Sequence, residues 1–489
     1  MSRSSAAIDL DGMLRDAAAL HRAGRLAEAE PLYLAILHEV PAHFDALHLI
    51  GVVRQQQGRD AEAIAFIDRA LALRPDNAAA LSNRALSLRA LGRAHEALAC
   101  CDRALAVKPD FADAHNNRGL ALAALKRPAE ALKSYEAALS HAPAHIDALN
   151  NCGIALFEVN RLDEALVCFD RVLALRPGHV HGSWNRAQVL LLMGDFARGW
   201  PEHEGRLASN PGLKRGFTQP LWLGDAPLAG RTILLRAEQG LGDTIQFCRY
   251  APMVAARGAR VVLEVQRPLV DLMRTLDSAI EVVARGDALP EFDLHCPLLS
   301  LPLAFKTELT TIPARTPYLR APAGAIDWKS RLGTKRPRIG LVWSGNPGHK
   351  RDATRSIPFY ALMPLLDIDA SFVSLQKDVR ASDAALLKQT GQVVDVADSL
   401  TSFAETASLI ATLDLVISVD TSAAHLTGAL GKPLWLLLPQ VPDWRWLMGR
   451  DDSPWYPTAR LFRQDTTRAW GGVVARIRAA LEDFVRRAA

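Results

Sequence analysis

Three residues that could hold a phosphate stand together in the C-terminal part of the sequence. Asp420, Thr421 and Ser422 follow an apolar run, 415–419, and precede a stretch of small residues, 423–430, after which a second apolar run begins. The first run is typical of a strand buried on both faces of a parallel sheet, and the three residues are types that cap helices. A helix start offers unpaired backbone N–H groups and a dipole that favours an anion. The stretch predicts a phosphate-binding βαβ unit, although a core βαβ unit with an ordinary cap has the same pattern.

A carboxylate also stands after an earlier predicted strand. The run 231–237 predicts a strand, the glycine-rich stretch 240–244 a turn, and 245–255 a helix. This order opens a Rossmann-like half, but Ile245 occupies the place of the third glycine of the dinucleotide fingerprint, so a dinucleotide site is not expected. Asp243 in the turn could act as a general base or could complement the dipole of the helix that follows it. Both interpretations remain open.

Basic and aromatic residues follow the strands of a second half. Arg355 ends a polar loop after the predicted strand 338–343, and Lys377 follows the predicted strand 371–375. Arg355 could stabilise a diphosphate and Lys377 could meet a ribose or base, or both could be solvated surface charges. The segment 440–464 is rich in aromatic residues, which either stack on a base or sugar or lock the C-terminal helix onto the sheet.

A repeat of 34 residues organises the first part of the chain. Prolines recur with this spacing at Pro41, Pro75, Pro109, Pro143, Pro177 and Pro211, and small residues recur in the same register. Small residues let two helices of a unit pack closely, and proline ends the second helix. The pattern resembles tetratricopeptide repeats, a helical solenoid of stacked units. We expect units at 10–43, 44–77, 78–111, 112–145 and 146–179, and a degenerate sixth unit from 180.

One polar position recurs within these units. Asparagine stands at Asn83, Asn117, Asn151 and Asn185, in the middle of each predicted first helix. Asparagine is a poor residue for a helix interior, so four in register need a reason. The side chains either bond neighbouring helices or form a ladder on the concave face that holds the backbone of an extended peptide. The second interpretation resembles the asparagine ladder of O-linked N-acetylglucosamine transferase.

Composition excludes several classes of partner. The net charge is +4, which is too mild to predict binding to nucleic acid or to a membrane surface. The sequence has no run near the roughly 20 apolar residues that a membrane span needs, and its start lacks the apolar segment of a signal peptide. The six cysteines show no CxxC spacing, and no metal site is expected. We expect a cytoplasmic protein without a nucleic-acid partner or a membrane span.

The predicted phosphate site resembles an element of a known family. Asp420-Thr421, followed by His425, a small-residue helix and Gly-Lys-Pro at 431–433, is similar to the diphosphate-binding element of the ADP-heptose lipopolysaccharide heptosyltransferases, glycosyltransferase family nine. Ser422 stands where that family usually has a glycine. The resemblance implies that the donor diphosphate is bound by Asp420, Thr421, Ser422 and His425.

The glycine-rich turn resembles a second motif of the same family. Gly242-Asp243, with Pro252 in the next helix, is similar to the heptosyltransferase opening motif, in which the aspartate faces the cleft and is the proposed general base. Carried over, Asp243 would take the proton of the acceptor as the anomeric carbon is attacked. Arg355 stands where the family has a basic residue that can stabilise the leaving diphosphate. Gly242 and Gln239, like Lys377, would contact the nucleotide or sugar.

The resemblance covers about residues 231–489 and contains both motifs. This region resembles the GT-B architecture, which has two Rossmann-like halves and binds the donor on the second half. We expect an all-α tetratricopeptide solenoid followed by an α/β GT-B region with two Rossmann-like halves. The layout is similar to that of O-linked N-acetylglucosamine transferase. The expected bounds are 10–206 for the solenoid, 207–230 for a junction, 231–325 for the acceptor-side half and 326–489 for the donor-side half.

The resemblance implies an inverting, metal-independent glycosyltransferase. It would move a sugar from a nucleotide diphosphate sugar, its co-substrate, to a protein or carrier-bound glycan that the repeats recruit, and it would need no other cofactor. A second hypothesis is a non-catalytic repeat scaffold whose transferase-like domain binds only a nucleotide or partner. A third is an enzyme of the nucleotide-sugar epimerase type, which would isomerise the nucleotide sugar without an acceptor.

Overall fold

The computed structural model describes residues 9–213, 215–324, 326–349 and 351–488. The chain forms two compact units, of which the first ends at Asn185 and the second begins at Arg186. The predicted fold class is confirmed: an all-helical solenoid precedes an α/β region with parallel sheets. The finer domain bounds stay predictions.

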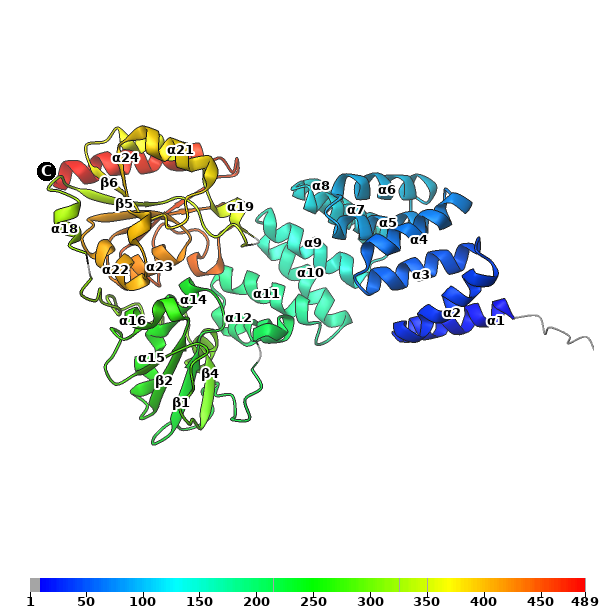
Figure 1. Cartoon of the computed structure of the whole chain (residues 1–489), viewed down its shortest axis with the longest axis horizontal. Helices are drawn as coiled ribbons and strands as arrows, with labels where there is room; N and C mark the ends of the chain where they lie inside the picture. The colour runs from blue at the N-terminus through cyan, green and yellow to red at the C-terminus, as the bar shows by residue number, and fades with distance from the viewer. Residues whose placement is uncertain (1–8, 214, 325, 350, 489) are drawn as a thin grey trace, which may run out of the picture. The chain divides into compact units, whose positions relative to one another are not determined.

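The first unit is a stack of helix pairs, which Figure 1 shows in blue to cyan. Its helices are α1 Leu10–Arg22, α2 Leu26–Glu39, α3 Phe44–Gln56, α4 Asp60–Leu73, α5 Ala78–Ala90, α6 Ala94–Val107, α7 Ala112–Ala124, α8 Pro128–His141, α9 Ile146–Glu158 and α10 Leu162–Leu175. Helix α11, Val180–Met193, spans the division between the two units.

Close packing within each pair explains the small residues of the repeat. A Cβ added to Gly119 of α7 would lie 2.4 Å from Tyr135 Cε1 of α8, and a Cβ on Gly153 of α9 would lie 2.6 Å from Phe169 Cε1 of α10. In these two pairs the aromatic side chain of the second helix therefore fills the space above the small residue of the first. Pro41 illustrates the second signal, because it lies in the turn directly after α2.

Two parallel sheets form the second unit. The first has the strand order β3-β2-β1-β4 and the second the order β10-β9-β8-β5-β6-β7. The strands of the first sheet are β1 Thr232–Arg236, β2 Arg260–Val265, β3 Glu281–Ala284 and β4 Leu294–Pro297. Those of the second are β5 Arg338–Val342, β6 Ser371–Ser374, β7 Val393–Asp395, β8 Leu415–Val419, β9 Leu434–Leu438 and β10 Ala459–Arg463. Parallel order with a helix between most successive strands is the Rossmann-like arrangement, and β3 is followed directly by β4.

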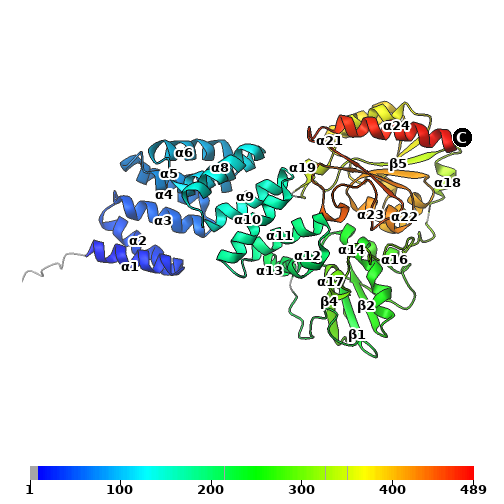
Figure 2. The same cartoon turned by 180° about the vertical axis from the view of Figure 1, so that it is seen from behind.

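Helices cover both faces of the second sheet. Figure 1 and Figure 2 agree that α21 and α24 lie on one face and α22 and α23 on the other. The longer helices of this unit are α12 Phe196–His203, α14 Leu241–Phe247, α21 Ala381–Thr390, α22 Phe403–Ala411, α23 Ser422–Ala429 and α24 Trp470–Ala488. The shorter ones are α13 Gly205–Ser209, α15 Ala251–Ala255, α16 Val270–Met273, α17 Leu301–Ala304, α18 Trp328–Arg331, α19 Asp352–Arg355 and α20 Met363–Leu366.

The aromatic residues of segment 440–464 have neighbours that neither interpretation of the sequence named. Trp444 packs edge to face on Trp200 of α12, and Trp455 packs on Phe247 of α14, both with ring centroids less than 6 Å apart. Helix α24 contacts the sheet through Phe484, which packs on the ring of Trp435, and through β10. The segment therefore joins the two halves of the unit, and its last part, β10, also packs against α24, where Nη2 of Arg476 donates to the backbone O of Arg463.

Candidate functional site

The two motifs singled out in the sequence meet in the second unit. The first turn of α14 packs against the first turn of α23. A Cβ on Gly242 would lie 2.8 Å from His425 Cδ2 and 3.5 Å from the Cα of Ser422. Any side chain at this position would push the two helices apart, so the glycine brings Asp243 to the start of the helix that was predicted to bind phosphate.

Asp243 both caps its own helix and pairs with a distant arginine. Its Oδ2 accepts a hydrogen bond from the backbone N of Gly240 at 2.8 Å, and its Oδ1 accepts one from Nη2 of Arg445 at 2.5 Å. The cap that the sequence suggested is therefore present. The side chain is about one-fifth exposed, so part of the carboxylate stays open to solvent.

Arg445 is the functional candidate that sequence reasoning missed. Its Nε donates to Oε1 of Gln246 on α14 and its Nη1 donates to Oδ1 of Asp443, both at 2.8 Å. Its guanidinium carbon lies 4.2 Å from the ring centroid of Trp444. Burial opposes the charge of Arg445, but the nearby aspartates outweigh burial and raise its pKa. One buried cation thus ties α14 to the segment after β9.

The start of α23 keeps its first backbone N–H groups without a side-chain cap. Thr421 is the N-cap residue, but its hydroxyl makes no cap bond and lies 3.2 Å from Oγ of Ser418. A helix N-terminus without a capping side chain leaves donors that an anion can satisfy. The small residues of α23 have a packing reason as well, since a Cβ on Gly428 would lie 2.3 Å from Tyr456 Cδ1.

Arg355 lies at the same end of β8. Its Nη1 donates to the backbone O of Asp420 at 3.0 Å, and a Cβ on Gly345 would lie 2.5 Å from its Nη2. Its Nε is buried, has no hydrogen-bond partner among the described residues, and lies 4.0 Å from the carboxylate of Asp352. A guanidinium with an unused donor therefore stands beside the start of α23, where the sequence predicted a cation.

The pKa values of two residues of the motif differ from their ordinary values, one upward and one downward. Burial, together with the carboxylate of Asp443, raises the pKa of Asp420 to about 6. Burial, together with Arg445, lowers the pKa of His425 to about 3. His425 is therefore neutral, and its Nε2 lies 3.7 Å from Oδ1 of Asp420.

His425 has the surroundings of a packed residue. Its Nδ1 lies 2.9 Å from the hydroxyl of Tyr456, its ring stacks on that of Trp446 with centroids 5.4 Å apart, and only 5% of the residue is exposed. Its direct contact with diphosphate stays a prediction. These contacts give His425 a packing role between Tyr456 and Trp446, next to Asp420 at the end of β8.

The other predicted contacts lie outside this cluster. The backbone O of Gln239 accepts a hydrogen bond from Gln266 Nε2 at 2.8 Å. Lys377 is exposed and its ammonium donates to the backbone O of Ala397 at 3.1 Å, on the β7 side of the sheet. Their roles stay predictions. Within the described residues there is no group of three or more His, Cys, Asp or Glu that could hold a metal ion, and none of the helices described combines the length and the apolar character of a membrane span.

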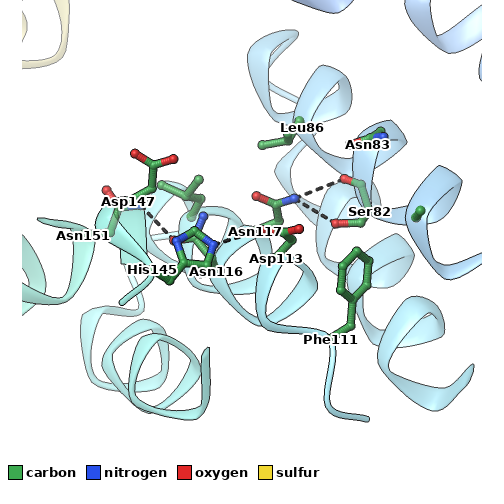
Figure 3. Close-up of a pocket in the computed structure, with 12 residues that line it drawn as sticks. Ser82, Asn83, Leu86, Phe111, Asp113, Asn116, Asn117, His145, Asp147 and Asn151 are labelled. Carbon is green, nitrogen blue, oxygen red and sulfur yellow. Dashed lines mark hydrogen bonds and ion pairs between the residues drawn. The ribbon is translucent and has the colours of Figure 1, made fainter. Parts of the chain in front are cut away.

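The recurrent asparagines bond the preceding repeat. Nδ2 of Asn117 donates to Ser82 Oγ at 2.9 Å, and Nδ2 of Asn151 donates to Asn116 Oδ1 at 2.9 Å. The other two behave alike: Asn83 Nδ2 lies 2.9 Å from His48 Nε2, and Asn185 Nδ2 donates to Asn150 Oδ1 at 3.0 Å. Bonding between neighbouring helices is thus one use of these residues. Asn83, Asn117 and Asn151 also line a groove of about 510 Å³, which Figure 3 shows.

Comparisons with known proteins match both parts of the chain. Residues 15–78, 82–146 and 122–182 match models of the tetratricopeptide repeat. Residues 374–437 match the model of glycosyltransferase family 9 (heptosyltransferase). The resemblance inferred from the sequence is confirmed in both parts, and the second match includes the whole Asp420–His425 motif.

One curated protein and two solved structures illustrate the similarity. Protein FlbA of Caulobacter vibrioides is 28% identical over 327 residues, which are 61% of this chain and 54% of FlbA, so the chain spans about half the length of that relative. A thermophilic tetratricopeptide protein of Thermus thermophilus is 24% identical, with a TM-score of 0.35, over 37% of this chain and 99% of its own. PilF of Pseudomonas aeruginosa is 19% identical, with a TM-score of 0.37, over 42% and 92%.

Proposed function

We propose that this chain, in which tetratricopeptide repeats precede a glycosyltransferase family 9 domain, transfers a sugar from a nucleotide diphosphate sugar to an acceptor that the repeats recruit. The observation that carries the proposal is the close approach of Gly242 to α23. It brings the candidate base and the candidate phosphate-binding helix start together. The acceptor would be a protein or a carrier-bound glycan.

The donor diphosphate is held by the start of α23 and by Arg355. The uncapped N–H groups after Thr421, the hydroxyls of Thr421 and Ser422 and the positive charge of Arg355, whose Nη1 donates to the backbone O of Asp420, support this site. A carboxylate beside a diphosphate would repel it. The raised pKa of Asp420 supports its place there, because this carboxyl takes up a proton more readily than an ordinary aspartate and, once protonated as the diphosphate binds, can donate to a phosphate oxygen. His425 acts through Asp420, which it contacts.

The transfer inverts the anomeric carbon. The acceptor hydroxyl oxygen attacks that carbon from the face opposite the diphosphate, a new carbon–oxygen bond forms, and the bond to the diphosphate oxygen breaks with its electron pair leaving on the nucleoside diphosphate. Asp243 takes the hydroxyl proton, and Arg445 fixes the orientation of its carboxylate. The helix start and Arg355 stabilise the charge of the leaving group, so no metal ion is needed.

One observation favours a second function. Both carboxylate oxygens of Asp243 already accept hydrogen bonds, which suits a structural residue as well as a base. In that case the domain binds a nucleotide or a partner without turnover, and the chain is a scaffold. The two functions therefore differ in what Asp243 does: a transferase needs its carboxylate as a base, and a scaffold needs it only for structure.

The test separates binding from turnover in an Asp243→Asn variant. We would incubate the full chain with a panel of nucleotide sugars and cell-extract acceptors and measure release of the nucleoside diphosphate, with nucleotide affinity measured in parallel. The transferase proposal predicts that Asp243→Asn lowers turnover by about 10²–10⁴-fold while the affinity stays unchanged. Turnover equal to wild type would contradict the role of Asp243, and nucleotide binding without any turnover by wild type would favour the scaffold.

A further inference from the structure

The groove of the solenoid is built by the first helices of three successive repeats. Helices α5, α7 and α9 line it with residues three or four positions apart, so each helix presents one face to it. Asparagines occupy the middle of that face. Asp113 and Asp147 lie in the first turns of α7 and α9, as Figure 3 shows, and the sequence places Leu86 and Leu120 toward the other ends of α5 and α7.

The hydrogen bonds between repeats decide which atoms the asparagines offer. Because Nδ2 of Asn117 and Nδ2 of Asn151 donate to the preceding repeat, their Oδ1 atoms are left as acceptors. Figure 3 shows Oδ1 of Asn117 turned away from Ser82. Asn116 is reversed, since its Oδ1 accepts from Asn151 and its Nδ2 is left as a donor. Alternating acceptors and donors match the N–H and C=O groups of an extended backbone.

The charge of the groove has one sign. Asp113 and Asp147 are exposed, and the residues that line the groove include neither lysine nor arginine. The hydrogen bond from His145, at 2.9 Å, lowers the pKa of Asp113 and offsets part of its charge when the imidazole is protonated. Asp147 lines the groove and forms no ion pair or hydrogen bond through its carboxylate among the described residues, although its charge is one of the causes that raise the pKa of His145.

We propose that this groove binds an extended, lysine- or arginine-bearing segment of a partner protein. The side-chain oxygens of Asn117 and Asn151 accept backbone N–H groups of the segment, and Asp113 and Asp147 bind its cationic side chains. Side chains alternate in direction along an extended chain, so residues between the cations face the leucines. The inference rests on the proposed recruiting role of the repeats and adds the chemistry of what is recruited.

The test measures binding of defined probes to the full chain by fluorescence anisotropy. One labelled twelve-residue peptide alternates lysine with alanine, and a second alternates glutamate with alanine. The variants are the double substitution Asp113→Asn and Asp147→Asn, which keeps the side-chain shape, and the matched control Asp163→Asn, an exposed aspartate of α10 that does not line the groove.

We expect the lysine probe to bind wild type and the Asp163→Asn control equally. Binding to the double variant should weaken about tenfold, and added salt should weaken binding to wild type, because the lost contacts are exposed charge pairs. Equal affinity for wild type and the double variant, or tighter binding of the glutamate probe, would overturn the proposal. Nucleoside diphosphate titration of the same protein separates the two claims, since it tests the donor site alone.

Discussion

The repeated arginines of the solenoid and two buried arginines of the α/β unit are used in opposite ways. In the solenoid an exposed arginine before each second helix pairs with a glutamate three residues later, at Arg25–Glu28, Arg59–Glu62, Arg93–Glu96, Arg127–Glu130 and Arg161–Glu164. In the α/β unit two arginines, Arg249 and Arg445, are buried and join distant segments. Arg249 donates to the backbone O of Trp455 at 2.7 Å, and Arg445 to the carboxylate of Asp243.

The difference indicates how strongly the loss of one arginine contact should destabilise each part. Local, exposed pairs repeat in every unit and contribute little each, so the solenoid spreads its stability over many equivalent contacts. A buried cation between two halves has no substitute, because its removal leaves unpaired carboxylates in the interior. Of the ten tryptophans only Trp184 lies in the first unit, so tryptophan fluorescence in urea follows the α/β unit and allows the contrast to be measured.

The largest effect is expected for Arg445→Met, which removes the cation but keeps much of the volume. The carboxylates of Asp243 and Asp443 would remain without their partner, and we expect the α/β unit to lose about 3–5 kcal/mol in urea unfolding followed by tryptophan fluorescence. Arg445→Lys keeps the charge and should lose less. A loss below about 1 kcal/mol for Arg445→Met would show that this pairing does not hold the halves together.

The next effect depends on pH and concerns Asp420. Its pKa is raised by burial to about 6 in the folded chain and lies near 4 in the unfolded chain, so the folded state binds the proton more tightly. Stability of the α/β unit therefore falls as the pH rises from about 4 to 6, and the full cost is present above pH 6. Asp420→Asn removes this cost and should stabilise the unit at pH 8 by on the order of 2–3 kcal/mol. An unchanged pH dependence in Asp420→Asn would contradict the assignment.

A smaller effect is expected for Gly242→Ala. The new Cβ would lie 2.8 Å from His425 Cδ2, so α14 and α23 must separate, at a cost of about 1–3 kcal/mol. Nucleotide affinity should fall as well. The matched control is Gly216→Ala, because a Cβ there meets nothing within 4 Å. Equal stability of the two variants would mean that the helices do not need the glycine.

The smallest effect is expected in the solenoid. Arg93→Ala breaks one exposed pair with Glu96, and solvent screens such a pair, so the unfolding transition followed by circular dichroism should not move beyond the error of the measurement. A clear shift of the midpoint would show that the repeats depend on single ion pairs and would remove the contrast with the α/β unit.

The fold and half of the candidate site follow from short-range signals. The 34-residue period depends on spacing alone, and the Asp420–Thr421 and Gly242–Asp243 motifs each lie within one strand–turn–helix segment. Arg445 could not be found in this way, because 202 residues separate it from Asp243 and no local pattern records their contact. The only signal was a charged residue between two tryptophans in a segment that follows a buried strand.

The orientation of side chains was the other feature that the sequence could not predict. The register of Asn117 and Asn151 identifies a repeated role, but whether the amide faces a ligand or the next helix depends on repeat stacking. The same holds for His425, whose place in a motif does not reveal that Tyr456 and Trp446 enclose it. Packing between segments decides these cases.

The most direct test of the donor site is calorimetric titration of the full chain with ADP, UDP, GDP and CDP. The comparison includes Thr421→Ala, Arg355→Ala and the control Arg487→Ala, an exposed arginine of α24. The account predicts selective binding of one nucleotide, weakened in the first two variants and unchanged in the control. Absence of binding by all four nucleotides, or equal affinity in all variants, would contradict a diphosphate site at the start of α23.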